Sequence, residues 1–263
     1  IIDSIDSNIR KKIIFPYPTF SLYDVFVNIN GFKSIKIPYN SKNYCLNYKK
    51  LINSIDNKTA ILFLPNPNVP IEGYLDQNEI IKIADKCEKN KCLFVIDEVY
   101  YHYGSISAVN LITKYKNIII LRSLSKGFGL PGLRVGYMIS SKKNIKYLSK
   151  NRVGYEANSL TIAASKVFLQ DKYFLKKYTS EIKSSLKLIQ NKMKTYDIKT
   201  VGGDYGNYIF IDFKNKLKCN YITRQLLKQK IVVRANWPKP FDTGILVSGT
   251  STKNTNIFLK KLL

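Results

Sequence analysis

Short apolar runs recur along the first half of the chain, and each ends in polar residues or in a glycine- or proline-rich stretch. Such runs are apolar on both faces, which is typical of strands buried inside a parallel sheet. The strands predicted on this basis lie at residues 13–15, 33–39, 58–64, 92–97, 118–121 and 135–139.

Helical patterns fill the intervals between these runs. Helices are predicted after the aromatic loop at residues 15–23, at residues 48–55, and from Asp76 to about residue 90. Asp76 and Glu79, three residues later, form the pattern of a capping box, which marks the start of the third helix. Strands that alternate with helices predict an α/β fold, in which a mostly parallel sheet carries helices on both faces.

The pattern changes from about residue 142. A long lysine-rich helical region spans residues 160–193, and Gly202-Gly203 breaks it. A strand at 208–213, a helix at 222–229, a strand at 231–234 and a terminal helix from Lys253 are then predicted. This order indicates a smaller α+β domain, so we divide the chain into a large domain, residues 1–145, and a small C-terminal domain, residues 146–263.

Composition narrows the class of protein. The chain has 263 residues, of which 45% are apolar, so it can bury a core. Its net charge of +25 would suit nucleic-acid binding, but the lysines are scattered among abundant Asn and Ile, which favours a compositional bias of the coding sequence. Four irregularly spaced cysteines and one histidine argue against disulfides and a metal site. We expect a cytoplasmic protein, because no apolar run is long enough to span a membrane and no signal pattern is present.

Polar side chains follow three of the predicted strands. Asn68, Asp97 and Lys126 each come after a strand end, and ligands of parallel sheets bind beyond the carboxyl ends of the strands. Asp97 follows an apolar run, where a carboxylate is costly unless a cation meets it. It is therefore either a helix N-cap or an acid that keeps a heterocyclic nitrogen protonated.

The segment around Lys126 is the richest in chemistry. Ser123 and Ser125 precede the lysine, and a stretch with glycines and a proline separates it from Arg134. An amine, hydroxyls and a guanidinium in one turning segment are what a phosphorylated carbonyl cofactor needs for a Schiff base and for its phosphate.

Three motifs together resemble the class I/II aminotransferases, which are fold-type I enzymes that use pyridoxal 5'-phosphate (PLP). They are the Arg122-Ser-Leu-Ser-Lys126 passage, the loop Pro65-Asn-Pro-Asn-Val-Pro70, and Asp97-Glu-Val-Tyr100. The histidinol-phosphate aminotransferase branch is the most similar. The resemblance implies a fold-type I large domain, PLP as the cofactor, no metal, and a homodimer.

The resemblance also implies roles for single residues. Lys126 would form the Schiff base with PLP and move the substrate's α-proton, and Asp97 would pair with the pyridinium nitrogen. Tyr100 would hydrogen-bond the phenolic oxygen of PLP. The other residues with implied roles are Asn68 (phenolic oxygen), Ser123, Ser125 and Arg134 (phosphate), Phe20 (stacking on the ring, or plain core), Ile5 and Asp6 (an N-terminal phosphate loop), and Arg234 and Asn207 (substrate).

The chain departs from the family pattern at three places. The asparagine loop carries an extra residue and lacks a threonine, so Asn68 is displaced by one position. Leu246 stands where the family has an arginine for the substrate carboxylate. The N-terminal part of the large domain is shortened or missing, so that Ile5 and Asp6 resemble the phosphate loop only in outline.

The predicted activity is transfer of an amino group from an anionic, phosphate-bearing amino acid or amine to a 2-oxo acid. One alternative is a PLP-dependent decarboxylase of a phosphorylated amino acid, which the missing arginine would suit. Another is a non-catalytic basic binding protein, against which Lys126, Asp97 and Tyr100 argue.

Overall fold

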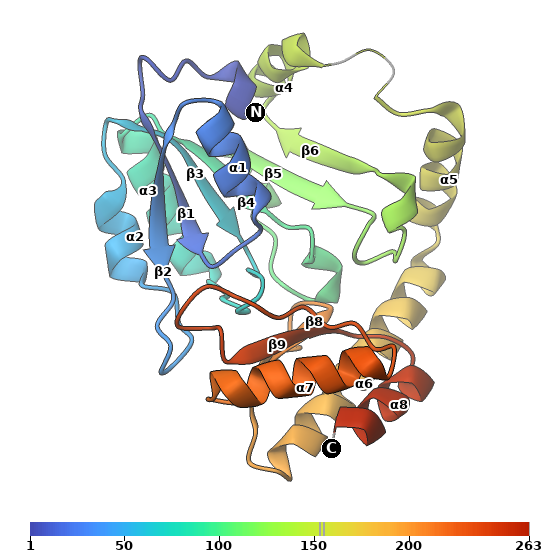
Figure 1. The fold of residues 1–263 in the computed structure, drawn as a ribbon. Coiled ribbons are helices and arrows are strands. Elements are labelled where there is room, and N and C mark those ends of the chain that lie inside the picture. Colours follow the sequence, from blue (N-terminus) through green and yellow to red (C-terminus); the bar gives the residue numbers. More distant parts are fainter. Residues whose placement is uncertain (153, 155, 263) are drawn as a thin grey trace.

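A six-stranded sheet forms the larger part of the computed structural model, which describes residues 1–152, 154 and 156–262. The strand order is β2-β1-β3-β4-β5-β6, and only β6 runs antiparallel to its neighbour. The mostly parallel sheet predicted from the sequence is confirmed (Figure 1). The strands are β1 (Lys12–Tyr17), β2 (Lys33–Pro38), β3 (Thr59–Pro65), β4 (Leu93–Asp97), β5 (Ile118–Ser123) and β6 (Gly136–Ser140).

Helices cover both faces of this sheet. One core packs α2 (Tyr48–Ser54) and α3 (Gln77–Lys89) against one face, and another packs α1 (Leu22–Ile29) and α4 (Lys142–Leu148) against the other. Alternate residues of the central strands enter the two cores, which explains why these strands are apolar at almost every position. The capping box at α3 is confirmed, since the Glu79 N–H donates to Asp76 Oδ1 at 2.8 Å.

A second, antiparallel sheet of three strands, β7-β8-β9, makes up the C-terminal part together with α6 to α8. In Figure 1 it lies beyond the carboxyl ends of the large sheet. The elements of this C-terminal part are α5 (Ser159–Gln170), α6 (Lys172–Lys194), β7 (Lys199–Gly202), β8 (Tyr208–Asp212), α7 (Lys216–Lys228), β9 (Gly244–Ser248) and α8 (Thr252–Leu262). Short 3-10 helices lie at Ile2–Ser4, Tyr101–Tyr103, Val109–Thr113, Pro131–Leu133 and Ser149–Asn151.

Three predicted elements differ from the structure. The helical region is two helices, because Asp171 ends α5 and caps α6 by accepting the Phe174 N–H at 2.8 Å. Helix α7 begins earlier than predicted, because Asn215 caps it. The strand predicted at residues 231–234 is wrong: only Arg234 makes a bridge, to Leu246.

The predicted domain boundary at residue 145 falls inside α4. The C-terminal end of this helix still belongs to the large sheet, since Leu148 packs in the core beneath α1. Helices α5 and α6 then lead to the smaller sheet. Within the described part of the chain, no helix combines the length and the apolar character needed to cross a membrane.

The loop after β3 joins the two sheets. The Glu72 carboxylate accepts the backbone N–H groups of Gly203 at 3.3 Å, Asp204 at 3.1 Å and Tyr205 at 3.1 Å. The Tyr74 ring stacks on the Tyr205 ring, with 4.1 Å between their centroids. The smaller sheet is therefore held against the edge where the strands of the large sheet end.

Candidate active site

Lys126 and Asp97 lie at the ends of adjacent parallel strands. Asp97 is the last residue of β4 and pairs with Leu121 of β5, and Lys126 follows the end of β5 in the next loop. The Lys126 Nζ lies 5.5 Å from the centroid of the Tyr100 ring. Burial lowers the pKa of Lys126, and the charge of Asp97 opposes this shift. A lysine of lowered pKa is a better nucleophile and proton acceptor near neutral pH.

Donors hold both carboxylate oxygens of Asp97. The Tyr23 hydroxyl donates to Oδ2 at 2.5 Å, and the Val99 N–H donates to Oδ1 at 3.1 Å. Burial raises the pKa of Asp97, while the hydrogen bonds from Tyr23 and Val99 act in the opposite direction. Asp97 is thus an oriented acceptor in a partly buried place, which suits a protonated ring nitrogen.

Tyr100 is a buried phenol between the two sheets. Its side chain is 6% exposed, and its ring lies edge-to-face with the Tyr208 ring at 5.0 Å. Burial and the nearby Asp97 raise the pKa of Tyr100, whereas the charge of Arg234 lowers it. The net rise keeps the hydroxyl protonated at neutral pH, so Tyr100 can donate a hydrogen bond.

Asn68 is fully buried and fastens two loops. Its Nδ2 donates to the Pro18 carbonyl at 3.0 Å and to the Ile71 carbonyl at 3.1 Å. Among the described atoms its Oδ1 has no hydrogen-bond partner. Both amide donors are therefore used within the protein, and the predicted bond of Asn68 to PLP stays a prediction.

The predicted phosphate-binding residues share the Lys126 loop. The Ser123 hydroxyl donates to the Val135 carbonyl at 3.1 Å and accepts the Ser125 N–H at 3.0 Å. Arg134 adopts a left-handed backbone conformation (φ 54°), and its exposed side chain donates to the Pro131 carbonyl at 3.1 Å. These contacts lie within the loop itself. To bind a phosphate with its Nη1, Arg134 would have to give up its hydrogen bond to the Pro131 carbonyl.

Phe20 lies in the loop that precedes α1. Its side chain is 46% exposed, and its ring meets the Tyr23 ring edge-on at 5.9 Å. Because Tyr23 contacts Asp97, Phe20 lies near the site, and its exposure leaves room for stacking on a ligand. The alternative that Phe20 is plain core does not fit this exposure.

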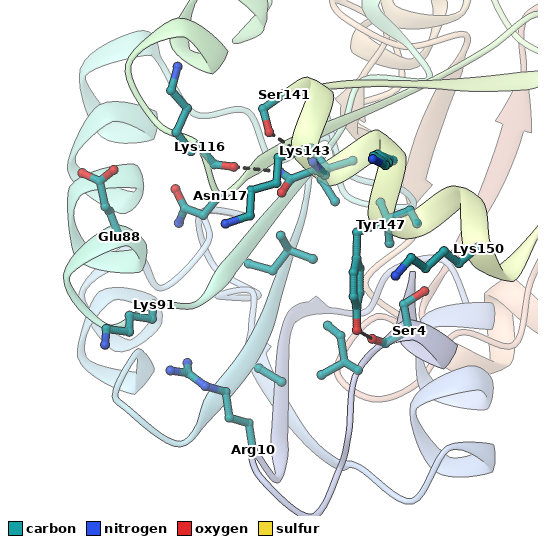
Figure 2. A pocket seen from close by; sticks show the side chains of 17 residues that line it. Ser4, Arg10, Glu88, Lys91, Lys116, Asn117, Ser141, Lys143, Tyr147 and Lys150 are labelled. Carbon is teal, nitrogen blue, oxygen red and sulfur yellow. Dashed lines mark hydrogen bonds between the residues drawn. The ribbon is translucent and has the colours of Figure 1, made fainter.

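Ile5 and Asp6 are not brought to Lys126. They precede the amino end of β1, whereas Lys126 follows the carboxyl end of β5. Ile5 lines a cavity of about 960 Å³ with Ala60, Leu93 and Ile119, near the amino ends of β3 to β5. Figure 2 shows this cavity, in which the Tyr147 hydroxyl donates to the Ser4 carbonyl at 3.1 Å.

Arg234 lies beside the smaller sheet and approaches the site. The Arg234 backbone pairs with Leu246, and its guanidinium lies 4.3 Å from the Trp237 ring centroid. The side chain is exposed and close enough for its charge to act on Tyr100. Asn207 precedes β8, and its carbonyl accepts the Gly249 N–H at 2.7 Å.

Sequence reasoning missed Tyr23, Glu72, Glu98 and Arg122. Tyr23 is 74 positions from Asp97 in the sequence, and no local pattern links them. Glu98 and Arg122 stand inside recognised motifs, but their pairing is visible only in three dimensions. The only local signal for Glu72 is that it lies in the segment where the asparagine loop is one residue longer.

Together these side chains match the needs of PLP at its ring-nitrogen and aldehyde ends. Asp97 is an anchored acceptor, Lys126 is an amine of lowered pKa, and Tyr100 is a protonated phenol. For the residues that the structure describes, no group of three or more His, Cys, Asp or Glu side chains could hold a metal ion.

Comparison with known proteins links this arrangement to one family. A family model described as "Aminotransferase class I and II" matches residues 3–262. The histidinol-phosphate aminotransferase of Caldanaerobacter subterraneus subsp. tengcongensis is 30% identical over 223 residues, which are 84% of this chain and 61% of that protein. The histidinol-phosphate aminotransferase of Methanococcus aeolicus is 30% identical over 226 residues, which are 85% of this chain and 60% of that protein. The chain therefore spans about three fifths of the length of these curated relatives.

Solved structures share the fold. A histidinol-phosphate aminotransferase from Sinorhizobium meliloti in complex with pyridoxal-5'-phosphate gives a TM-score of 0.90 at 19% identity, covering 99% of this chain and 71% of that one. The enzyme of the same name from Clostridium acetobutylicum gives 0.87 at 23% identity, covering 96% and 77%. At these identities the structures establish the common fold.

Proposed function

The chain belongs to the class I and II aminotransferase family, and we propose that it is a PLP-dependent aminotransferase. It transfers an amino group from an anionic amino acid or amine to a 2-oxo acid. The observation that carries this proposal is the placement of Lys126 and Asp97 at the ends of neighbouring strands, with Tyr100 between the two sheets.

Each of these residues has a task toward the cofactor. When bound, PLP supplies an aldehyde that condenses with amines and a protonated ring that withdraws electrons. The Lys126 Nζ would hold the cofactor covalently through its aldehyde. Once the amine of the donor has replaced it there, the freed Nζ would move the proton of the donor's α-carbon. Asp97 would keep the proton on the ring nitrogen, and Tyr100 would donate toward the phenolic oxygen.

The substrate in this proposal carries a phosphate or a similar anion, like histidinol phosphate. Two observations support it: the names of the relatives and the exposed guanidinium of Arg234 beside the site. Arg234 is bridged to Leu246, so a cation stands next to the position where the family arginine is missing.

A second candidate is decarboxylation of a phosphorylated amino acid. Leu246 favours it, because an enzyme that expels the carboxylate has less need of an arginine there. Product analysis separates the two activities. Release of carbon dioxide without any requirement for a 2-oxo acid would replace the transaminase proposal.

We also propose a homodimer in the cytoplasm. On α1 the side chains of Leu22, Val25, Phe26 and Ile29 are 43%, 44%, 46% and 73% exposed. They lie on one side of the helix, at the spacing of an apolar stripe that a second copy would cover.

The four cysteines are free, which suits a reducing compartment such as the cytoplasm.

An absorption spectrum tests the cofactor and its lysine together. Purified protein with PLP is expected to show a visible band that changes on adding an amino donor, and borohydride should fix the cofactor to Lys126. Lys126→Ala should abolish both effects, while Lys143→Ala, a lysine of the distant cavity, should leave them unchanged. Wild-type protein without such a band would overturn the proposal.

A further inference from the structure

Tyr23 occupies an enclosed position next to Asp97. The Tyr23 side chain is 8% exposed, and its ring stacks on Phe63 of β3 with 4.9 Å between centroids. Phe20 meets the same ring edge-on at 5.9 Å. These contacts restrict both side-chain torsions, so the hydroxyl points in a set direction, and it lies 2.5 Å from Asp97 Oδ2.

We propose that Tyr23 is a positioning residue, whose hydroxyl holds the Asp97 carboxylate ionised and oriented for the ring nitrogen of the cofactor. This inference rests on the proposed function, because it concerns a bound PLP ring. With Oδ2 held by Tyr23 and Oδ1 by the Val99 N–H, the plane of the carboxylate is set from two sides.

The groups around Asp97 act on its carboxylate in opposite directions, and the Tyr23 bond favours the charged form. Titratable groups from three segments act on Asp97 or on its partner Tyr23. Helix α1 supplies Tyr23, the segment after β4 supplies Glu98 and Tyr100, and the loop after β5 supplies Lys126. Burial raises the pKa of Asp97 and Glu98 adds to the rise, whereas Tyr23, Val99 and Lys126 lower it. Without the Tyr23 hydroxyl the balance moves toward the neutral acid, which is a weaker acceptor for a pyridinium N–H.

Tyr23 itself stays a donor over the whole working range of pH. Burial, together with the charge of Asp97, raises the pKa of Tyr23 well above its ordinary value. The phenol therefore does not lose its proton to Asp97. Its role is to orient the carboxylate and to stabilise its charged form, while the proton that matters for catalysis lies on the cofactor side.

Tyr23→Phe is the decisive variant, because it removes only the hydroxyl and keeps the ring on Phe63. Tyr115→Phe is the matched control: Tyr115 is also buried, and its hydroxyl donates to the Asp85 carboxylate at 2.6 Å, in the other core. NMR of the Asp97 carboxyl carbon in apoprotein should show a higher pKa in Tyr23→Phe and no change in Tyr115→Phe.

The loaded protein gives a second readout. With PLP labelled at the ring nitrogen, the nitrogen resonance should report a protonated ring in wild type and in Tyr115→Phe, and a partly deprotonated ring in Tyr23→Phe. Loss of a hydrogen bond to a charged group should also weaken PLP binding by about tenfold. Difluorotyrosine incorporated at position 23, a stronger donor, should move the Asp97 pKa in the opposite direction.

The outcomes distinguish the positioning role of Tyr23 from the proposed function. Suppose that wild type shows the PLP absorption band, but that Tyr23→Phe has the same Asp97 pKa and the same ring-nitrogen resonance as wild type. This result would overturn the positioning role alone. Absence of any PLP band in wild type would overturn the proposed function and this inference with it. If Tyr23→Phe does not fold, the Asp97 pKa of the difluorotyrosine variant provides the test.

Discussion

Arg122 and Glu98 form an ion pair between the ends of β5 and β4. The Nη2 and Nε of Arg122 lie 2.8 and 3.1 Å from Glu98 Oε2. The Glu98 side chain is 1% exposed, and its Oε1 accepts the Ala108 N–H at 2.7 Å. The pair joins the residue after Asp97 to the residue before Ser123, so it ties the two strands that carry the site.

Removing one partner of this pair should be costly. Arg122→Met leaves the Glu98 carboxylate buried without its cation, and such a change typically lowers the free energy of unfolding by about 3–5 kcal/mol. The double variant Arg122→Met/Glu98→Gln should recover much of this loss, because no charge remains unpaired. Urea denaturation of the wild type and the variants measures the difference. A single variant as stable as the double one would contradict the prediction.

Glu72 should contribute to the stability of the contact between the two sheets. Glu72→Ala leaves the N–H groups of Gly203, Asp204 and Tyr205 without their acceptor, which should lower the free energy of unfolding by about 1–3 kcal/mol. Protease cleavage near residues 202–206 should become faster, because the loop is no longer held. Glu88→Ala, at an exposed glutamate of α3, is the control and should leave both measurements near wild type.

Asp97 should make the apoprotein less stable as pH rises. Its folded-state pKa is raised, mainly by burial, so the stability linked to its protonation is present below its unfolded value of about 3.9. That stability is lost as pH rises through the folded pKa. Asp97→Asn cannot ionise, so its stability relative to wild type should increase over this window, while activity should fall by roughly a hundredfold or more.

Thermal melts of apoprotein from about pH 4 to pH 8 measure this effect of Asp97. A stability difference between wild type and Asp97→Asn that is independent of pH would show that folding does not shift the Asp97 pKa. Asp85→Asn, at an acid of α3 distant from the site, is a suitable comparison.

Arg234 should set the affinity for the anionic group of the donor. Loss of a charge-assisted hydrogen bond costs about 1.5–3 kcal/mol, so Arg234→Ala should raise the KM of the anionic donor about tenfold or more. The KM of an amino donor that lacks the anionic group should change little in Arg234→Ala. Arg224→Ala on α7, which removes another exposed guanidinium, provides the charge-matched control. Equal effects of both variants would indicate long-range attraction instead of a direct contact.

Local patterns in the sequence were sufficient for the framework of the fold and for the chemistry of the Lys126 loop. Strand burial follows from apolar runs, and the start of α3 follows from Asp76 and Glu79, because these signals act between near neighbours. Parallel strands bring their carboxyl ends to one edge, so Asp97 and Lys126 could be placed together without a structure.

Tertiary structure alone decided which side chains meet across layers. The sequence contained the Tyr23 hydroxyl and the Asp97 carboxylate, but their bond depends on how α1 packs against β3 and β4, which no periodicity encodes. In the same way, packing engaged both amide donors of Asn68 and left Ile5 at the far end of the sheet. The sequence by itself determined the groups that are available for catalysis, whereas the packing of helices on the sheet determined their orientation and their charge.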